Sequence, residues 1–82
     1  HEGLSMALSE SDVVAAVGGI TARRLRALIR RGWVQPERRG GAPEFSEIDV
    51  ARVRLVCHLT DRLEVPEEDV PLILSLVDQV YG

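Results

Sequence analysis

The centre of this chain reads Thr21-Ala22-Arg23-Arg24-Leu25-Arg26-Ala27-Leu28-Ile29-Arg30-Arg31-Gly32. Threonine is a good N-cap and glycine a common helix stop, so residues 21–31 are predicted to form one short helix, the arginine helix. Its apolar residues recur at helical spacing and form one stripe: Ala22, Leu25, Leu28 and Ile29. Arginines occupy the opposite side and the flanks: Arg23, Arg26 and Arg30, with Arg24 and Arg31 beside them. Such a helix suits an anionic partner, or it is simply a solvated basic surface.

A shorter helix is predicted before the arginine helix. Ser9 and Asp12 have capping-box spacing, an apolar run follows, and Gly18-Gly19 ends the element. The link from Gly18 to Thr21 has the length of the tight turn in a helix-turn-helix, with glycine where φ must be positive. Residues 9–32 therefore have the outline of a DNA-reading helix-turn-helix. Upstream, the alternation over residues 4–8 is typical of a short strand or an extended arm.

A small hairpin is predicted directly after the arginine helix. Trp33-Val34-Gln35-Pro36 is β-prone, and Gly40-Gly41 separates two short β-like runs. A hairpin in this position is a wing, expected over residues 33–45. Its Arg38 and Arg39 lie near the tip, where they are well placed for phosphates.

Two helices are predicted in the C-terminal half. Ser46 and Asp49 form a second capping pattern and open a long helix over residues 46–63. Its main apolar stripe is Ile48, Ala51, Leu55, Leu59 and Leu63, and a second stripe is Val50, Val53 and Cys57. The last helix, residues 69–81, carries a wide apolar stripe of Val70, Ile73, Leu74, Val77 and Val80. It is expected to cover one face of the long helix and to offer apolar surface for a homodimer.

The predicted fold is therefore mainly α: a winged helix-turn-helix with a small two-stranded wing and two C-terminal helices, in a single domain of 82 residues. Charge is strongly polarised along it. All ten basic residues are arginine, and seven of them lie within residues 23–39 beside a single acid, Glu37. Cys57 is the only cysteine, which favours a reducing compartment, and no run of residues resembles a signal peptide or a membrane span. A cytoplasmic protein is expected.

Residues that could support catalysis or metal binding are sparse. His58 and Asp61 are three residues apart on the long helix, but no nucleophile accompanies them. One cysteine and one internal histidine cannot build a four-ligand zinc site. The acidic step Glu64-Val65-Pro66-Glu67-Glu68-Asp69 lacks the alternating oxygen ligands of a calcium loop. No catalytic, cofactor or metal site is predicted, and the chain is expected to be a binding module rather than an enzyme.

The N-terminal residues resemble the MerR-like winged helix-turn-helix group. The similarity covers residues 9–56 and is carried by Gly19-Ile20-Thr21, Leu25-Arg26, Gly32-Trp33-Val34-Gln35-Pro36 and Phe45-Ser46-Glu47-Ile48-Asp49. It implies that the arginine helix enters the major groove and that the wing holds the DNA backbone. The candidate nucleic-acid residues are Arg23, Arg24, Arg26, Arg30, Arg38 and Arg39. Two positions depart from the MerR pattern and weaken DNA contacts: Ala27-Leu28 replaces aromatic residues, and Glu44 replaces a basic residue before Phe45.

The C-terminal half is similar to chaperone modulators of the CbpM type. The similarity lies in a long helix, a short acidic step and an apolar helix ending in Leu76-Val77-Asp78-Gln79-Val80. It implies a small bacterial cytoplasmic protein that binds and inhibits the J-domain of a DnaJ-like, curved-DNA-binding co-chaperone. J-domains present a basic helix, so the candidate partner-binding residues are acidic: Glu44, Glu47, Asp49, Glu64, Glu67, Glu68 and Asp69. A MerR-like DNA-binding transcriptional regulator is the alternative that the sequence leaves open.

Overall fold

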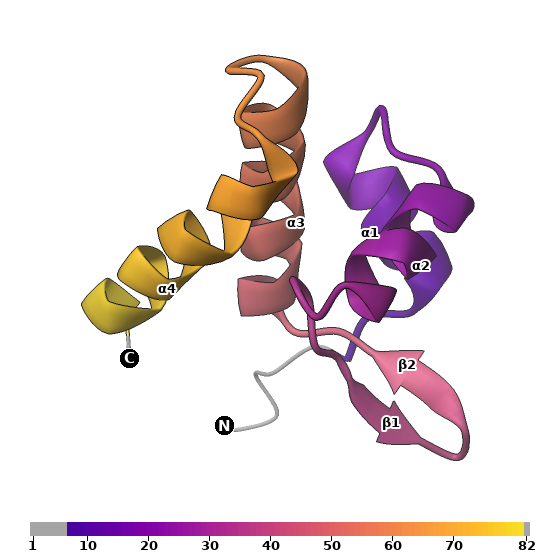
Figure 1. Ribbon diagram of the computed structural model, residues 1–82. Helices are drawn as coiled ribbons and strands as arrows, with labels where there is room; N and C mark the ends of the chain where they lie inside the picture. Colours follow the sequence, from indigo (N-terminus) through magenta and orange to yellow (C-terminus); the bar gives the residue numbers. More distant parts are fainter. Residues whose placement is uncertain (1–6, 82) are drawn as a thin grey trace.

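The computed structural model describes residues 7–81 of the chain. Its elements follow the order α1 (Glu10–Val17), α2 (Ala22–Arg30), β1 (Glu37–Arg39), β2 (Ala42–Glu44), α3 (Glu47–Asp61), the 3-10 helix η1 (Glu67–Asp69) and α4 (Val70–Tyr81). The predicted winged helix-turn-helix with two further helices is confirmed. In Figure 1, α3 stands between the α1–α2 pair on one side and α4 on the other, with the wing below α2.

The helix-turn-helix is set by local signals that the sequence carries. Ser9 and Asp12 form the reciprocal capping box of α1, and the Thr21 hydroxyl accepts a hydrogen bond from the Arg24 backbone N–H to cap α2. Gly18 and Gly19 both adopt positive φ, at 69° and 74°, which lets the chain reverse between the helices. Val13 and Leu25 are fully buried, so each helix turns one apolar side to the core.

The wing is a two-stranded antiparallel ribbon in which Arg38 pairs with Pro43 and Arg39 with Ala42. Gly40 and Gly41 make the turn with consecutive positive φ values, as a type I′ hairpin turn requires. An isolated bridge joins Leu8 to Phe45, with N···O distances of 2.9 and 2.8 Å. Of the short strand or extended arm expected over residues 4–8, the structure shows this bridge at Leu8, while residues 4–6 lie outside the described residues.

The buried side of α3 differs from the main stripe that the sequence predicted. Val50, Val53, Val56 and Leu59 are buried, whereas Ile48 is 69% exposed and Leu63 is 60% exposed. The core side therefore takes Val50 and Val53 from the second predicted stripe and Leu59 from the main one. Val56, which belonged to neither stripe, is fully buried. The prediction that Ile48 lies on a buried side was wrong: Ile48 stands in the first turn of α3, and α4 diverges from α3 toward this end of the helix (Figure 1).

The last helix packs on α3 through Val70 and Leu74, which are both buried. The predicted start near Asp69 is close, since Asp69 ends η1 and Pro71 sits in the first turn of α4. Leu72, Leu76 and Val80 recur every four residues and are 54–78% exposed. The homodimer expected through this helix stays a prediction. Within residues 7–81, no helix combines the length and apolar character needed to cross a membrane.

Candidate nucleic-acid interface

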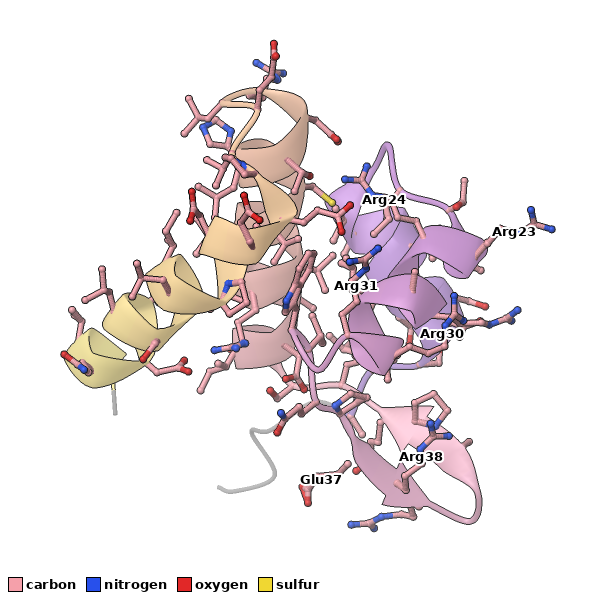
Figure 2. The ribbon with its side chains drawn as sticks, viewed as in Figure 1. Arg23, Arg24, Arg30, Arg31, Glu37 and Arg38 are labelled. Carbon is pink, nitrogen blue, oxygen red and sulfur yellow. The ribbon has the colours of Figure 1, made fainter. Side chains whose placement is uncertain are left out.

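The outer side of α2 carries two arginines whose guanidinium groups make no ion pair within residues 7–81. These are Arg23 and Arg30, both exposed, seven residues apart on one side of the helix. Arg38 of the wing lies on the same side, and Figure 2 shows all three directed away from α3 and α4. The arrangement places three positive charges on one outward surface, suited to phosphates along a nucleic-acid backbone.

Arg24 points the other way and ties α2 to the C-terminal end of α3. Its Nη1 donates to Asp61 Oδ2 at 2.8 Å, and its Nη2 donates to Asp61 Oδ1 at 2.9 Å and to Thr60 Oγ1 at 2.7 Å. These hydrogen bonds hold the pKa of the Asp61 carboxyl below its usual value. Arg24, a candidate DNA contact in the sequence, is therefore occupied by the protein itself.

The Arg24–Asp61 pair predicts a pH-dependent contribution to stability. Because the pKa of Asp61 is depressed in the folded state, the pair stabilises the fold above the usual aspartate pKa of about 3.9, and this stabilisation is lost as pH falls through the folded pKa. Asp61→Asn should therefore unfold at lower urea than the wild type at neutral pH, with the gap closing in strong acid. An equal gap at both pH values would contradict the assignment. In an Arg24→Gln background, Asp61→Asn should have little further effect.

Arg26 is also held within the chain, by the first turn of α1. Its Nε donates to Glu10 Oε2 at 3.1 Å and its Nη2 to Glu10 Oε1 at 2.7 Å, a bidentate pair. The hydrogen bond from Arg26 holds the pKa of Glu10 below its usual value. The Arg26 side chain is nevertheless 61% exposed, so the guanidinium can still reach an external anion.

Arg31 and the wing complete the basic set. Arg31 forms an ion pair with Glu67 of η1 and lies 5.1 Å from the centre of the Trp33 ring. In Figure 2 it extends from the end of α2 toward α3 and α4. On the wing, Arg38 donates to the Gly41 carbonyl at 3.4 Å, and the Arg39 Nε lies 3.5 Å from Glu44 Oε2. Of the six candidate DNA contacts, the structure thus gathers Arg23, Arg30 and Arg38 and ties Arg24, Arg26 and Arg39 to carboxylates.

The candidate partner-binding acids fall into two groups at opposite ends of α3, which is about 22 Å long. Near its start, Glu44 faces Arg39, and the Asp49 carboxylate accepts a hydrogen bond from the Ser46 backbone N–H. Glu47 is exposed in the same region. Beyond its end, Glu64, Glu68 and Asp69 are exposed and make no ion pair within residues 7–81; we call these three residues the acidic ledge. Glu67, which lies between them in sequence, forms an ion pair with Arg31.

The residues that could support catalysis are not assembled into a site. Both Asp61 oxygens accept from Arg24, so Asp61 does not orient His58 as a catalytic acid would. Cys57 is half-buried, and burial raises the pKa of its thiol, which keeps it protonated. Among residues 7–81, no group of three or more His, Cys, Asp or Glu side chains is placed to hold a metal ion.

Sequence reasoning missed the internal counterions. Glu10 and Asp61 lie 16 and 37 residues from the arginines that they bind, so no local spacing pairs them. One signal was available in the arginine helix itself. Arg24 and Arg31 are seven residues apart and flank the apolar stripe, so both border the surface that packs on the rest of the fold.

A protein-family model matches most of the chain. The family model described as "MerR HTH family regulatory protein" matches residues 10–75, from the first turn of α1 into α4. Neither the curated proteins nor the solved structures gave a match. The matched segment covers most of the chain and includes both helices of the helix-turn-helix, the wing, α3 and η1. The chain therefore belongs to the MerR helix-turn-helix family of regulatory proteins.

Proposed function

We propose that this protein is a chaperone modulator that binds the J-domain of a DnaJ-like, curved-DNA-binding co-chaperone and inhibits it. The distribution of free charge is the observation that supports this function. Three of the five arginines in the arginine helix are neutralised by carboxylates of the same chain: Arg24, Arg26 and Arg31. The acidic ledge, in contrast, has no basic partner within residues 7–81 and is open to a cationic surface.

The proposed mechanism is occlusion without catalysis. Glu64, Glu68 and Asp69 lie within six residues around η1, on a segment anchored by Glu67 to Arg31 and by the buried Val70 to α3. A cluster of negative charge steers a basic J-domain helix into contact and fixes its orientation. Because that helix borders the loop that contacts Hsp70, a bound modulator would block the co-chaperone from reaching its Hsp70. The proposed inhibition also keeps the co-chaperone from acting on DNA.

A titration tests the proposal directly. The purified chain is added to the isolated J-domain of a DnaJ-like co-chaperone from the same organism, and binding is followed by calorimetry. Binding at micromolar protein that weakens as salt is raised is expected, because exposed charges are screened within about 10 Å at 0.1 M salt. Absence of binding at micromolar protein and low salt would remove the proposal.

A second candidate function is DNA-binding transcriptional regulation. The observation that favours it is the outward surface formed by Arg23, Arg30 and Arg38, together with membership of a helix-turn-helix family of regulators. In this function α2 enters the major groove, and the wing contacts the backbone beside it. The two candidates use opposite charges on separate surfaces, so they are tested independently.

Replacing Arg23 and Arg30 together with glutamine should weaken DNA binding uniformly across sequences. Each lost phosphate contact is expected to reduce the slope of log affinity against log salt by about one unit, so the double variant loses about two. Fluorescence anisotropy with a short labelled duplex measures both quantities. Arg62→Gln is the matched control for Arg30→Gln alone, since each removes one charge and Arg62 caps the C-terminal end of α3, away from the wing. A slope that falls equally for Arg62→Gln and Arg30→Gln would contradict the assignment.

A further inference from the structure

A cleft of about 560 Å³ lies between the first turn of α1, the outer side of α2 and the wing. Its polar lining comes from three elements that are distant in sequence: Ser9, Glu10, Ser11, Arg26 and Arg38. Arg26 enters from α2 and Arg38 from β1, so two guanidinium groups border one hollow. The cleft is continuous with the side of α2 that carries Arg23 and Arg30, because Arg26 lies between them on the same helical side.

Glu10 fills the position that an anionic ligand of this cleft would take. Its two carboxylate oxygens accept from Nε and Nη2 of Arg26, at 3.1 and 2.7 Å. A phosphodiester presents two non-bridging oxygens with similar bidentate geometry, so the same guanidinium edge can bind either group. The Glu10 side chain is 24% exposed while that of Arg26 is 61% exposed, so the carboxylate lies on the inner side of the pair.

We propose that the cleft is a binding site for one backbone phosphate of DNA, and that Glu10 is an internal competitor that lowers the affinity of this site by occupying Arg26. The inference rests on the second candidate function, DNA binding, and adds to it a residue that sets the affinity. Binding exchanges the Glu10 carboxylate for a phosphate on Arg26, with Arg38 on the other wall of the cleft.

The amide groups at the start of α1 are not needed for this site. The Ser9 hydroxyl already accepts from the Asp12 backbone N–H, and the Asp12 carboxylate accepts from the Ser9 backbone N–H. This capping box stabilises the first turn without Glu10, so Glu10 can be changed while α1 remains capped. The side-chain hydrogen bonds that the Glu10 carboxylate accepts within residues 7–81 come from Arg26.

The size of the effect follows from the exposure of the pair. Exposed ion pairs contribute little, so removing the competitor should tighten DNA binding by no more than about fivefold. The slope of log affinity against log salt should also become steeper, by up to about one unit. In the wild type, a phosphate that binds Arg26 must displace the Glu10 carboxylate, whereas in the variant there is no carboxylate to displace. Both changes have the opposite sign to those expected from removing an arginine.

The test measures anisotropy of a short labelled duplex between about 50 and 200 mM salt. Glu10→Gln is compared with Glu68→Gln, which changes the net charge equally at an exposed residue that makes no ion pair within residues 7–81. Tighter binding by Glu10→Gln than by Glu68→Gln is expected. In an Arg26→Gln background the effect of Glu10→Gln should vanish, because its target is gone.

The possible outcomes distinguish the role of Glu10 from DNA binding itself. If the wild type binds DNA but Glu10→Gln and Glu68→Gln tighten it equally, the effect is one of net charge and the role of Glu10 is overturned while DNA binding stands. Persistence of the Glu10→Gln effect without Arg26 overturns it as well. If neither the wild type nor the Glu10→Gln variant binds at about 50 mM salt, both DNA binding and the site inferred from it are rejected.

Discussion

Phe45→Ala should reduce the free energy of unfolding by about 3–5 kcal/mol, the usual cost of emptying a buried aromatic position. Phe45 is 1% exposed and lies where the wing ends and α3 begins. Its backbone is bridged to Leu8, and its ring belongs to the cluster that includes Val13, Leu25 and Val53. A domain of this size has roughly 5–15 kcal/mol of stability in total, so the variant should unfold at much lower urea.

Ile48→Ala is the matched control for this measurement. Ile48 lies three residues further along the chain but is 69% exposed, and alanine is the better helix former. Its substitution should change the unfolding free energy by no more than about 0.5 kcal/mol. Urea unfolding followed by circular dichroism compares the two variants. A large loss of unfolding free energy in Ile48→Ala would indicate that Ile48 is buried, as the sequence predicted. It would contradict the buried side of α3 that the structure shows.

Reversing the charge of the acidic ledge should abolish J-domain binding if the proposed function is correct. Changing Glu64 and Glu68 to lysine places like charges opposite a basic helix, which costs several kcal/mol and lowers the association rate. The two residues are exposed and make no ion pair within residues 7–81, so the fold should be unaffected. Calorimetric titration against the J-domain measures the loss, and circular dichroism confirms that the variant is folded.

Glu47→Lys, at the opposite end of α3, is the matched control for Glu68→Lys alone, since each reverses one charge. Glu47 is exposed and acidic, but about 22 Å of helix separates it from the ledge. It should retain J-domain binding with only a small change from net charge. Equal losses in both variants would show that overall charge, rather than the ledge, governs binding. A larger loss for Glu47→Lys would move the partner surface to the base of the wing, beside Glu44 and Asp49.

Local features of this protein were predictable because they depend on neighbouring residues. Ser9, Thr21 and Ser46 cap their helices through hydrogen bonds that span three residues. The paired glycines take the positive φ values that their turns require. Leu25 and Leu28 are buried as the period of the arginine helix predicted. These short-range interactions can be predicted from the sequence alone.

The buried side of α3 was not predictable in the same way. Its sequence offers apolar residues on more than one side, and helical periodicity alone does not say which side another element will cover. The packing of the other helices on α3 decides this, since Ile48 is exposed while Val56 is fully buried. The same holds for the candidate site, where Arg24 and Arg23 are adjacent in sequence but only Arg24 faces Asp61.

The sequence by itself determined the winged helix-turn-helix, the position of the arginine helix and the excess of acid beyond it. The tertiary structure alone decided which of its charges remain free. Arg24, Arg26 and Arg31 meet carboxylates 16 to 37 residues away, and Arg23 and Arg30 meet none within residues 7–81. The physical reason is that an ion pair requires atoms to approach within about 4 Å, and only packing brings distant segments that close.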